Sequence, residues 1–191
     1  MKLYSKIRGL SLLLLWIILS AGCKSNVPEA MQFQVNPDLL GARQRDTLLE
    51  VTYASPIGFM TSTNEQAIRQ GAMSQADEGV EIRAVYQNDA SQAFMVISAI
   101  TEERWEQLSS SSGQEAFSSA VWTNMNAAAY GYKNFDVRQW LLQNQEWINF
   151  KLIFKTEKDR FFQLDYLLPS SEYNEQTAKA VESSIGSFNS F

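Results

Sequence analysis

Three segments near the C-terminal end alternate apolar and polar residues with the period of two that is typical of β-strands. They cover residues 137–142, 147–155 and 160–168, and short polar stretches separate them. The apolar positions of the second and third segments are Ile148, Phe150, Leu152, Phe154, Phe162, Leu164, Tyr166 and Leu168. Pairing these apolar sides predicts a three-stranded antiparallel meander, with one wall left for a helix to cover. Lys151 and Asp165 fall on the opposite wall, where we expect a cross-strand ion pair.

The rest of the chain adds strands and helices around this meander. Strands are predicted at 47–54, 80–87 and 93–100, the last two as an antiparallel hairpin with 93–100 in the sheet interior. Helices are predicted at 64–78, 101–108, 112–130 and 170–184 from capping residues and glycine stops. We therefore expect an α+β domain, with a central antiparallel sheet of about six strands and helices packed on its faces.

The longest predicted helix, 112–130, opens with the capping-box pattern Ser112-x-x-Glu115. Its predicted buried stripe consists of Phe117, Val121, Met125 and Ala128. We expect Trp122, Tyr130 and Tyr132 to be partly exposed, which makes them candidates for a contact patch. Packing in the core is the alternative for each of these three residues.

The first 22 residues have the three parts of an export signal. Lys2, Lys6 and Arg8 precede an apolar run at 10–19, and small residues then lead to Cys23, the sole cysteine of the chain. A spanning helix needs about 20 apolar residues and this run has about half of that, so we interpret it as a processed signal. Residues 19–23, Leu-Ser-Ala-Gly-Cys, resemble the lipobox of bacterial lipoproteins. An ordinary secretory signal that ends by chance at a cysteine is the alternative.

The resemblance to lipoproteins implies cleavage between Gly22 and Cys23. It also implies a diacylglyceryl group on the Cys23 sulfur and an acyl chain such as palmitate on the new amine. Such acyl chains together hold a protein stably on a membrane. Lys24 stands where a retention signal for the inner membrane would have Asp, which implies the periplasmic side of the outer membrane in a cell with two membranes.

The chain is expected to divide into three parts. Residues 1–22 form the lipoprotein signal peptide, and residues 23–46 form the acylated cysteine and a tether. The tether has two prolines and little periodicity, with a short helix at about 38–45. Residues 47–191 form a single α+β domain, a length that suits one domain.

The net charge and the lack of histidine argue against several classes of function. Residues 1–22 hold three of the 16 basic residues and none of the 21 acidic ones, so the remaining chain has a net charge of −8. Nucleic-acid binding requires a basic face, and we expect none here. The chain has no histidine, which excludes Ser-His-Asp and Cys-His catalysis and His-ligated metal sites. We expect no metal, no cofactor and no catalytic residues.

The order of elements resembles the DcrB-like and PsbP-like sandwich families. The likeness rests on 53–59, which contain a Pro-x-Gly turn, on 150–169, on Tyr173 and on Ile-Gly-Ser-Phe at 185–188. The tryptophan often found after that turn is missing here. The resemblance implies a central antiparallel sheet with helices on its faces, in families whose members mostly bind or assemble other macromolecules. It transfers no catalytic residue to this chain.

Two functions follow from these observations. The first is a membrane-anchored envelope lipoprotein with a non-catalytic domain that binds a protein partner or supports an assembly. The alternative is a carrier or sensor of an apolar or aromatic small molecule. Its cavity, between sheet and helix, would be lined by Trp140, Trp147, Phe150 and Tyr166.

Overall fold

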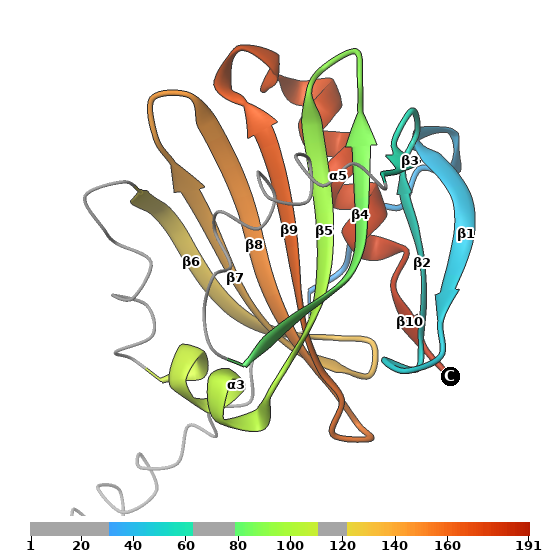
Figure 1. Ribbon diagram of the computed structural model, residues 1–191, viewed down its shortest axis with the longest axis vertical. Coiled ribbons are helices and arrows are strands. Elements are labelled where there is room, and N and C mark those ends of the chain that lie inside the picture. The colour runs from blue at the N-terminus through green and yellow to red at the C-terminus, as the bar shows by residue number, and fades with distance from the viewer. Residues whose placement is uncertain (1–30, 63–78, 111–121) are drawn as a thin grey trace, which may run out of the picture.

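A large antiparallel sheet forms the centre of the computed structural model, which describes residues 31–62, 79–110 and 122–191 (Figure 1). Its seven strands run in the order β3-β4-β5-β9-β8-β7-β6. In sequence order they are β3 (Met60–Thr61), β4 (Val80–Asn88), β5 (Ala93–Ile100), β6 (Thr123–Tyr132), β7 (Phe135–Gln143), β8 (Trp147–Thr156) and β9 (Phe161–Pro169). This confirms the predicted meander, the β4–β5 hairpin and the interior position of β5 between β4 and β9. The fold is α+β, with more sheet than the sequence predicted.

A second, smaller sheet lies beside the large one and has the order β1-β2-β10. It consists of β1 (Leu40–Asp46), β2 (Val51–Pro56) and β10 (Asn189–Ser190), and the short 3-10 helix η1 (Pro37–Leu39) precedes it. The predicted irregular tether up to residue 46, with a helix at 38–45, is therefore wrong for 37–46. The β1 strand forms because its backbone pairs antiparallel with β2, across an irregularity between Leu40 and Arg43. That irregularity hides the period of two in the sequence.

Two α-helices in the described ranges cover opposite faces of the large sheet. The first, α3 (Glu102–Ser109), begins at the predicted N-cap Thr101, whose side chain accepts a hydrogen bond from the Arg104 backbone. The second, α5 (Glu175–Gly186), lies behind the sheet in Figure 1. Its N-cap is Asn174 and not the predicted Ser170 or Ser171, which instead form the 3-10 turn η2 (Ser170–Glu172).

The predicted helix at 112–130 is wrong from residue 123 onward, and residues 111–121 lie outside the described ranges. Residues 123–132 form β6, which pairs with β7 in nine register positions. Tyr130 and Tyr132 are buried on the same face of the sheet, which is the period of two and not of 3.6. The helix propensity of the Ala-rich stretch is overridden because pairing with β7 buries these two rings.

The main hydrophobic core lies between the large sheet, α5 and the small sheet. Its centre is a stack of three phenylalanine rings. They belong to Phe154 of β8, Phe162 of β9 and Phe188, which lies two residues after the end of α5. The ring centroids of Phe154 and Phe162 are 4.6 Å apart, and Phe188 lies 5.5 Å and 5.7 Å from them. The opposite sheet face carries two smaller clusters, one of which includes Trp105 and Leu108 of α3. Buried faces on both sides of the sheet explain why β8 and β9 are nearly continuous in buried residues.

Several predictions lie outside the described ranges. They are the signal peptide, Cys23 and the helix at 64–78. Among the described helices, none has the length and apolar character required to cross a bilayer.

Candidate functional site

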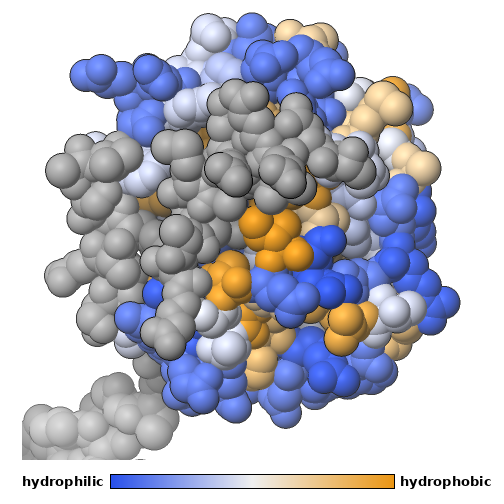
Figure 2. Space-filling view, in the orientation of Figure 1, coloured by the Kyte–Doolittle hydropathy of each residue, from blue (hydrophilic) through white to orange (hydrophobic). Residues whose placement is uncertain are grey.

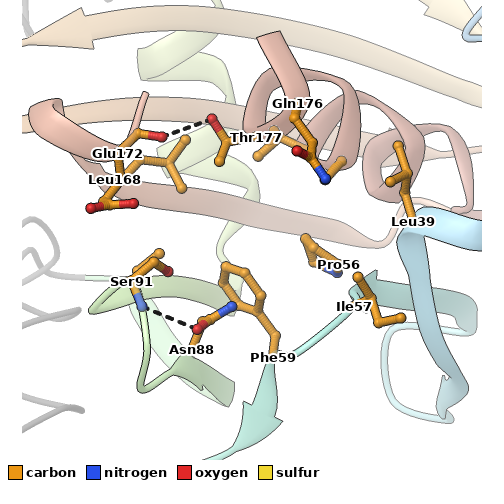
Figure 3. A pocket seen from close by; sticks show the side chains of 13 residues that line it. Leu39, Pro56, Ile57, Phe59, Asn88, Ser91, Leu168, Glu172, Gln176 and Thr177 are labelled. Atoms are coloured by element: carbon orange, nitrogen blue, oxygen red, sulfur yellow. Dashed lines mark hydrogen bonds between the residues drawn. The ribbon is translucent and has the colours of Figure 1, made fainter. Parts of the chain in front are cut away.

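An open apolar groove lies between the beginning of α5, the turn after β2 and the turn that joins β4 to β5 (Figure 3). Its volume is about 180 Å³. The apolar lining consists of Leu39, Pro56, Ile57, Phe59, Ala93, Leu168, Ala180 and Val181. The polar residues Asn88, Ser91, Glu172, Gln176 and Thr177 complete the lining.

The turn after β2 forms one wall of this groove. The Phe59 backbone N–H donates to the carbonyl oxygen of Pro56 at 3.2 Å, which closes a four-residue turn. Gly58 has a φ of 82°, the left-handed value that the third residue of a type II turn requires. A Cβ added at Gly58 would lie 3.0 Å from the Asn88 side-chain nitrogen. Glycine therefore lets the turn lie against Asn88 and directs Ile57 and Phe59 to the groove.

The beginning of α5 forms the facing wall. Asn174 Oδ1 accepts hydrogen bonds from the backbone of Gln176 and Thr177, at 2.9 Å and 3.0 Å. In return, Thr177 Oγ1 accepts from the Asn174 backbone at 2.9 Å, which completes a capping box. Thr177 Oγ1 also lies 3.0 Å from the carbonyl oxygen of Glu172, as Figure 3 shows. These bonds fix the first turn of the helix and so fix the polar rim of the groove.

An exposed hydrophobic side chain lies at the mouth of the groove, because Ile57 lines the groove and is 59% exposed. Met60, three residues along the chain on the short edge strand β3, is 74% exposed. Exposed apolar side chains that adjoin a groove with a polar rim are typical of interaction sites. The signal in the sequence was the placement of isoleucine in a Pro-x-Gly turn, where a polar residue is usual. Ile57 is not among the contact residues that the sequence predicts.

The predicted contact residues do not form a patch. Trp122 is half-buried, whereas Tyr130 and Tyr132 are buried in the main core, which was the alternative interpretation. The Tyr130 hydroxyl donates to Gln139 Oε1 at 2.6 Å, and the Tyr132 hydroxyl donates to the carbonyl oxygen of Gly186 at 2.7 Å. Burial raises the pKa of both tyrosines. Both rings therefore serve packing and internal hydrogen bonding.

The four residues proposed to line one ligand cavity are divided between the two faces of the sheet. Phe150 and Tyr166 belong to the main core under α5. Trp140 belongs to the α3 cluster, and Trp147 packs against the cluster formed by β4, β5 and β9. Strand alternation explains the split, because Trp147 and Phe150 are three positions apart along β8 and so point to opposite faces of the sheet.

A buried polar cluster occupies the middle of the sheet face opposite α5 and lies beneath the molecular surface that Figure 2 shows. Lys151 Nζ lies 2.6 Å from Asp165 Oδ1, and these side chains are 3% and 0% exposed. Asn149 Nδ2 donates to the same oxygen at 3.0 Å, and Gln163 Nε2 donates to Asp165 Oδ2 at 2.7 Å. The predicted ion pair is confirmed, and it is fully buried among hydrogen-bond donors.

The acidic residues at the start of α3 are exposed. Across the described ranges, no three His, Cys, Asp or Glu side chains come together as a metal site would require. The expectation that the protein has no metal stays a prediction.

Comparison with known proteins bears on the fold. No family model matches the sequence, and no curated protein matches it either. Among solved structures, cyanobacterial PsbP (CyanoP) from Synechocystis sp. PCC 6803 is similar, with a TM-score of 0.50 and 14% sequence identity. The likeness covers 82% of this chain and 95% of that one. The fold is PsbP-like. This confirms the PsbP-like part of the predicted resemblance at the level of architecture, and identity this low shows the fold alone.

Proposed function

We propose that this protein is a lipid-anchored component of the bacterial envelope, whose PsbP-like domain binds a protein partner without catalysis. The observation that carries the proposal is the apolar groove with Ile57 exposed at its mouth. The proposed anchor is Cys23, which is acylated, and the chain is cleaved between Gly22 and Cys23. It holds the domain on a membrane, on the periplasmic side of the outer membrane in a cell with two membranes.

The size of the groove favours a side chain of a protein partner over a carried molecule. Pockets for drug-sized ligands measure about 300–1,000 Å³. The groove measures about 180 Å³, close to the roughly 150 Å³ of a cavity that holds one benzene. A single leucine or phenylalanine side chain fits this space, and the polar rim offers hydrogen bonds to the partner's backbone. Buried anchors of this kind dominate the affinity of protein interfaces.

Metabolic labelling tests the anchor. We expect labelled palmitate to be incorporated into the full chain in cells, and the Cys23→Ser variant to carry no label. Label retained by the variant, or a mature chain that begins elsewhere than at residue 23, would refute the anchor.

Site-specific crosslinking in cells tests the groove. A photoreactive phenylalanine analogue in place of Ile57 should give a discrete adduct with one protein. The matched control is the same analogue at Leu48, which is 60% exposed against 59% for Ile57 and lies outside the groove. Ala180→Leu places a larger side chain in the groove and should abolish the adduct, whereas Ala127→Leu, at an exposed position of β6, should not. Equal adducts from positions 57 and 48 would contradict the proposed contact.

A further inference from the structure

A second groove, of about 410 Å³, lies at the other end of α5 and carries two positive charges. The described residues that line it include Arg43 of β1 and Lys133 of the β6–β7 turn, and no acidic residue. The groove also contains Val35, Pro37, Ser187 and Asn189. In a chain whose part after residue 22 has a net charge of −8, a wholly positive groove is unusual.

Arg43 and Lys133 differ from most other basic residues of the described ranges. Seven lysines and arginines there form ion pairs with a carboxylate. Within the same ranges, neither Arg43 nor Lys133 forms an ion pair. The two cations instead repel each other. Burial lowers the pKa of Lys133, and the nearby Arg43 guanidinium lowers it further. An anion between them would remove that repulsion.

Hydrogen bonds hold the Lys133 ammonium in place. Its Nζ donates to the carbonyl oxygens of Gly186 and Phe188, at 3.0 Å and 2.8 Å, and lies 4.8 Å from the ring centroid of Tyr132. An ammonium has three donors, so one remains for a ligand. Arg43 is exposed on β1 and presents a guanidinium, which matches the geometry of a phosphate.

The groove lies where the chain approaches the proposed anchor. The Met31 backbone donates to the carbonyl oxygen of Gly131 at 3.0 Å, two residues before Lys133, and Val35 and Pro37 line the groove itself. Cys23 precedes Met31 by eight residues. Eight extended residues reach about 30 Å at most. If Cys23 is acylated, this end of the domain is therefore kept close to the lipid surface.

We infer that the groove between Arg43 and Lys133 binds the phosphate of an anionic phospholipid headgroup in the membrane that holds the protein. The inference rests on the proposed lipid anchor. Because that anchor keeps the groove close to a membrane, we infer that the ligand is a lipid headgroup and not free phosphate. It explains how an acidic domain, which an anionic surface would otherwise repel, can be oriented on that surface.

Vesicle co-sedimentation tests the inference. The chain from residue 23, carrying Cys23→Ser so that no acyl chain attaches, is mixed at 0.1 M salt with vesicles of phosphatidylglycerol or of phosphatidylcholine. We expect stronger partitioning to phosphatidylglycerol. Each basic residue near an anionic surface contributes a factor of about five. Arg43→Gln should therefore weaken partitioning about five-fold, and the double variant with Lys133→Gln about 25-fold.

Controls separate the groove from general charge. Lys155→Gln with Lys179→Gln removes two exposed cations elsewhere and should change partitioning less than two-fold. Arg43→Gln tests the groove even if Lys133→Gln impairs folding, because Arg43 is exposed and Lys133 binds the end of α5. Equal partitioning to both lipids, or equal loss in both double variants, would overturn the inference. Saturable binding of inorganic phosphate without preference for phosphatidylglycerol would also overturn it.

The vesicle assay is independent of acylation. A full chain with Cys23 in place that takes up no palmitate label would refute the anchor and leave the vesicle result standing. Failure to bind phosphatidylglycerol would refute the headgroup site and leave the anchor untouched.

Discussion

Breaking the buried ion pair between Lys151 and Asp165 should destabilise the protein more than any other single charge removal on β8. Lys151→Met removes the Lys151 cation from beside the buried Asp165 carboxylate. Removing one partner of a buried pair costs about 3–5 kcal/mol. Asn149 and Gln163 still donate to the carboxylate, so we expect the lower end, about 3 kcal/mol. A domain of this size has roughly 5–15 kcal/mol of stability in all.

Lys155 provides a matched control on the same strand and the same side. It is 37% exposed and lies 3.1 Å from Asp159, which is 70% exposed. Exposed pairs contribute about 0–1 kcal/mol, so Lys155→Met should cost less than about 1 kcal/mol. Urea denaturation followed by circular dichroism gives both free energies of unfolding. A cost for Lys151→Met as small as that for Lys155→Met would refute the reasoning.

A double-mutant cycle then isolates the pair itself. Asp165→Asn removes the negative charge and keeps one oxygen as an acceptor for Asn149 or Gln163. In the double variant with Lys151→Met neither charge of the pair is left, so the two costs should not add. We expect a coupling free energy of about 2 kcal/mol. Strict additivity would mean that the two charges do not depend on each other.

Three further perturbations test other parts of the structure. Gly186→Ala would place a Cβ 2.8 Å from the Phe33 Cβ, so residues 31–36 should detach and become sensitive to proteases, while the domain stays folded. Asn174→Ala removes the cap of α5 and should cost about 1 kcal/mol in urea denaturation, and a loss below about 0.3 kcal/mol would contradict the capping box. Raising the pH should unfold the protein, because burial raises the pKa of three tyrosines above the value of about 10 that they have when unfolded. These tyrosines are Tyr53, Tyr130 and Tyr166. The contribution of these three protonated tyrosines to the free energy of unfolding is complete below pH 10 and should fall by about 4 kcal/mol per pH unit above pH 10. A free energy of unfolding that stays constant between pH 10 and 11 would contradict this prediction.

The sequence was most informative where side-chain alternation and strand pairing coincide. The meander was predictable because each strand buries one apolar side against α5, and Lys151 and Asp165 had to face each other once that register was set. The burial of Lys151 and Asp165 was not predictable. The apolar and polar residues of a strand alternate in the same way whether the second face of the sheet is exposed to solvent or buried. Only the clusters on that face show that it is buried.

Residues 123–132 show where local signals fail. The serine and glutamate that precede them and the alanines within them all favour a helix, and those preferences are weak, below about 1 kcal/mol per residue. The strand signal was the triplet Tyr130-Gly131-Tyr132 followed by Lys133 and Asn134, a two-residue hairpin turn in which Lys133 has a φ of 50°. Pairing with β7 depends on residues farther along the chain, so local propensity could not decide it.

Neither groove could be predicted from local sequence patterns, because each groove joins segments that are distant in the sequence. The apolar groove joins the turn after β2 to the start of α5, and the basic groove joins β1 to the β6–β7 turn. Residues 37–46 were predicted as a tether without a role in either groove. Their folding onto the domain brings Leu39 to one groove and Arg43 to the other.

The helix α5 separates the two grooves. The apolar groove adjoins its first turns, and the basic groove adjoins its C-terminal end at Gly186. Twelve helical residues span about 18 Å, so the two grooves lie at opposite ends of one rigid element. If the basic groove holds a lipid headgroup, the apolar groove with Ile57 at its mouth points away from the bilayer. A partner protein in the envelope can then reach Ile57 while the lipid-facing end stays on the membrane, so the two proposed contacts do not compete for the same surface.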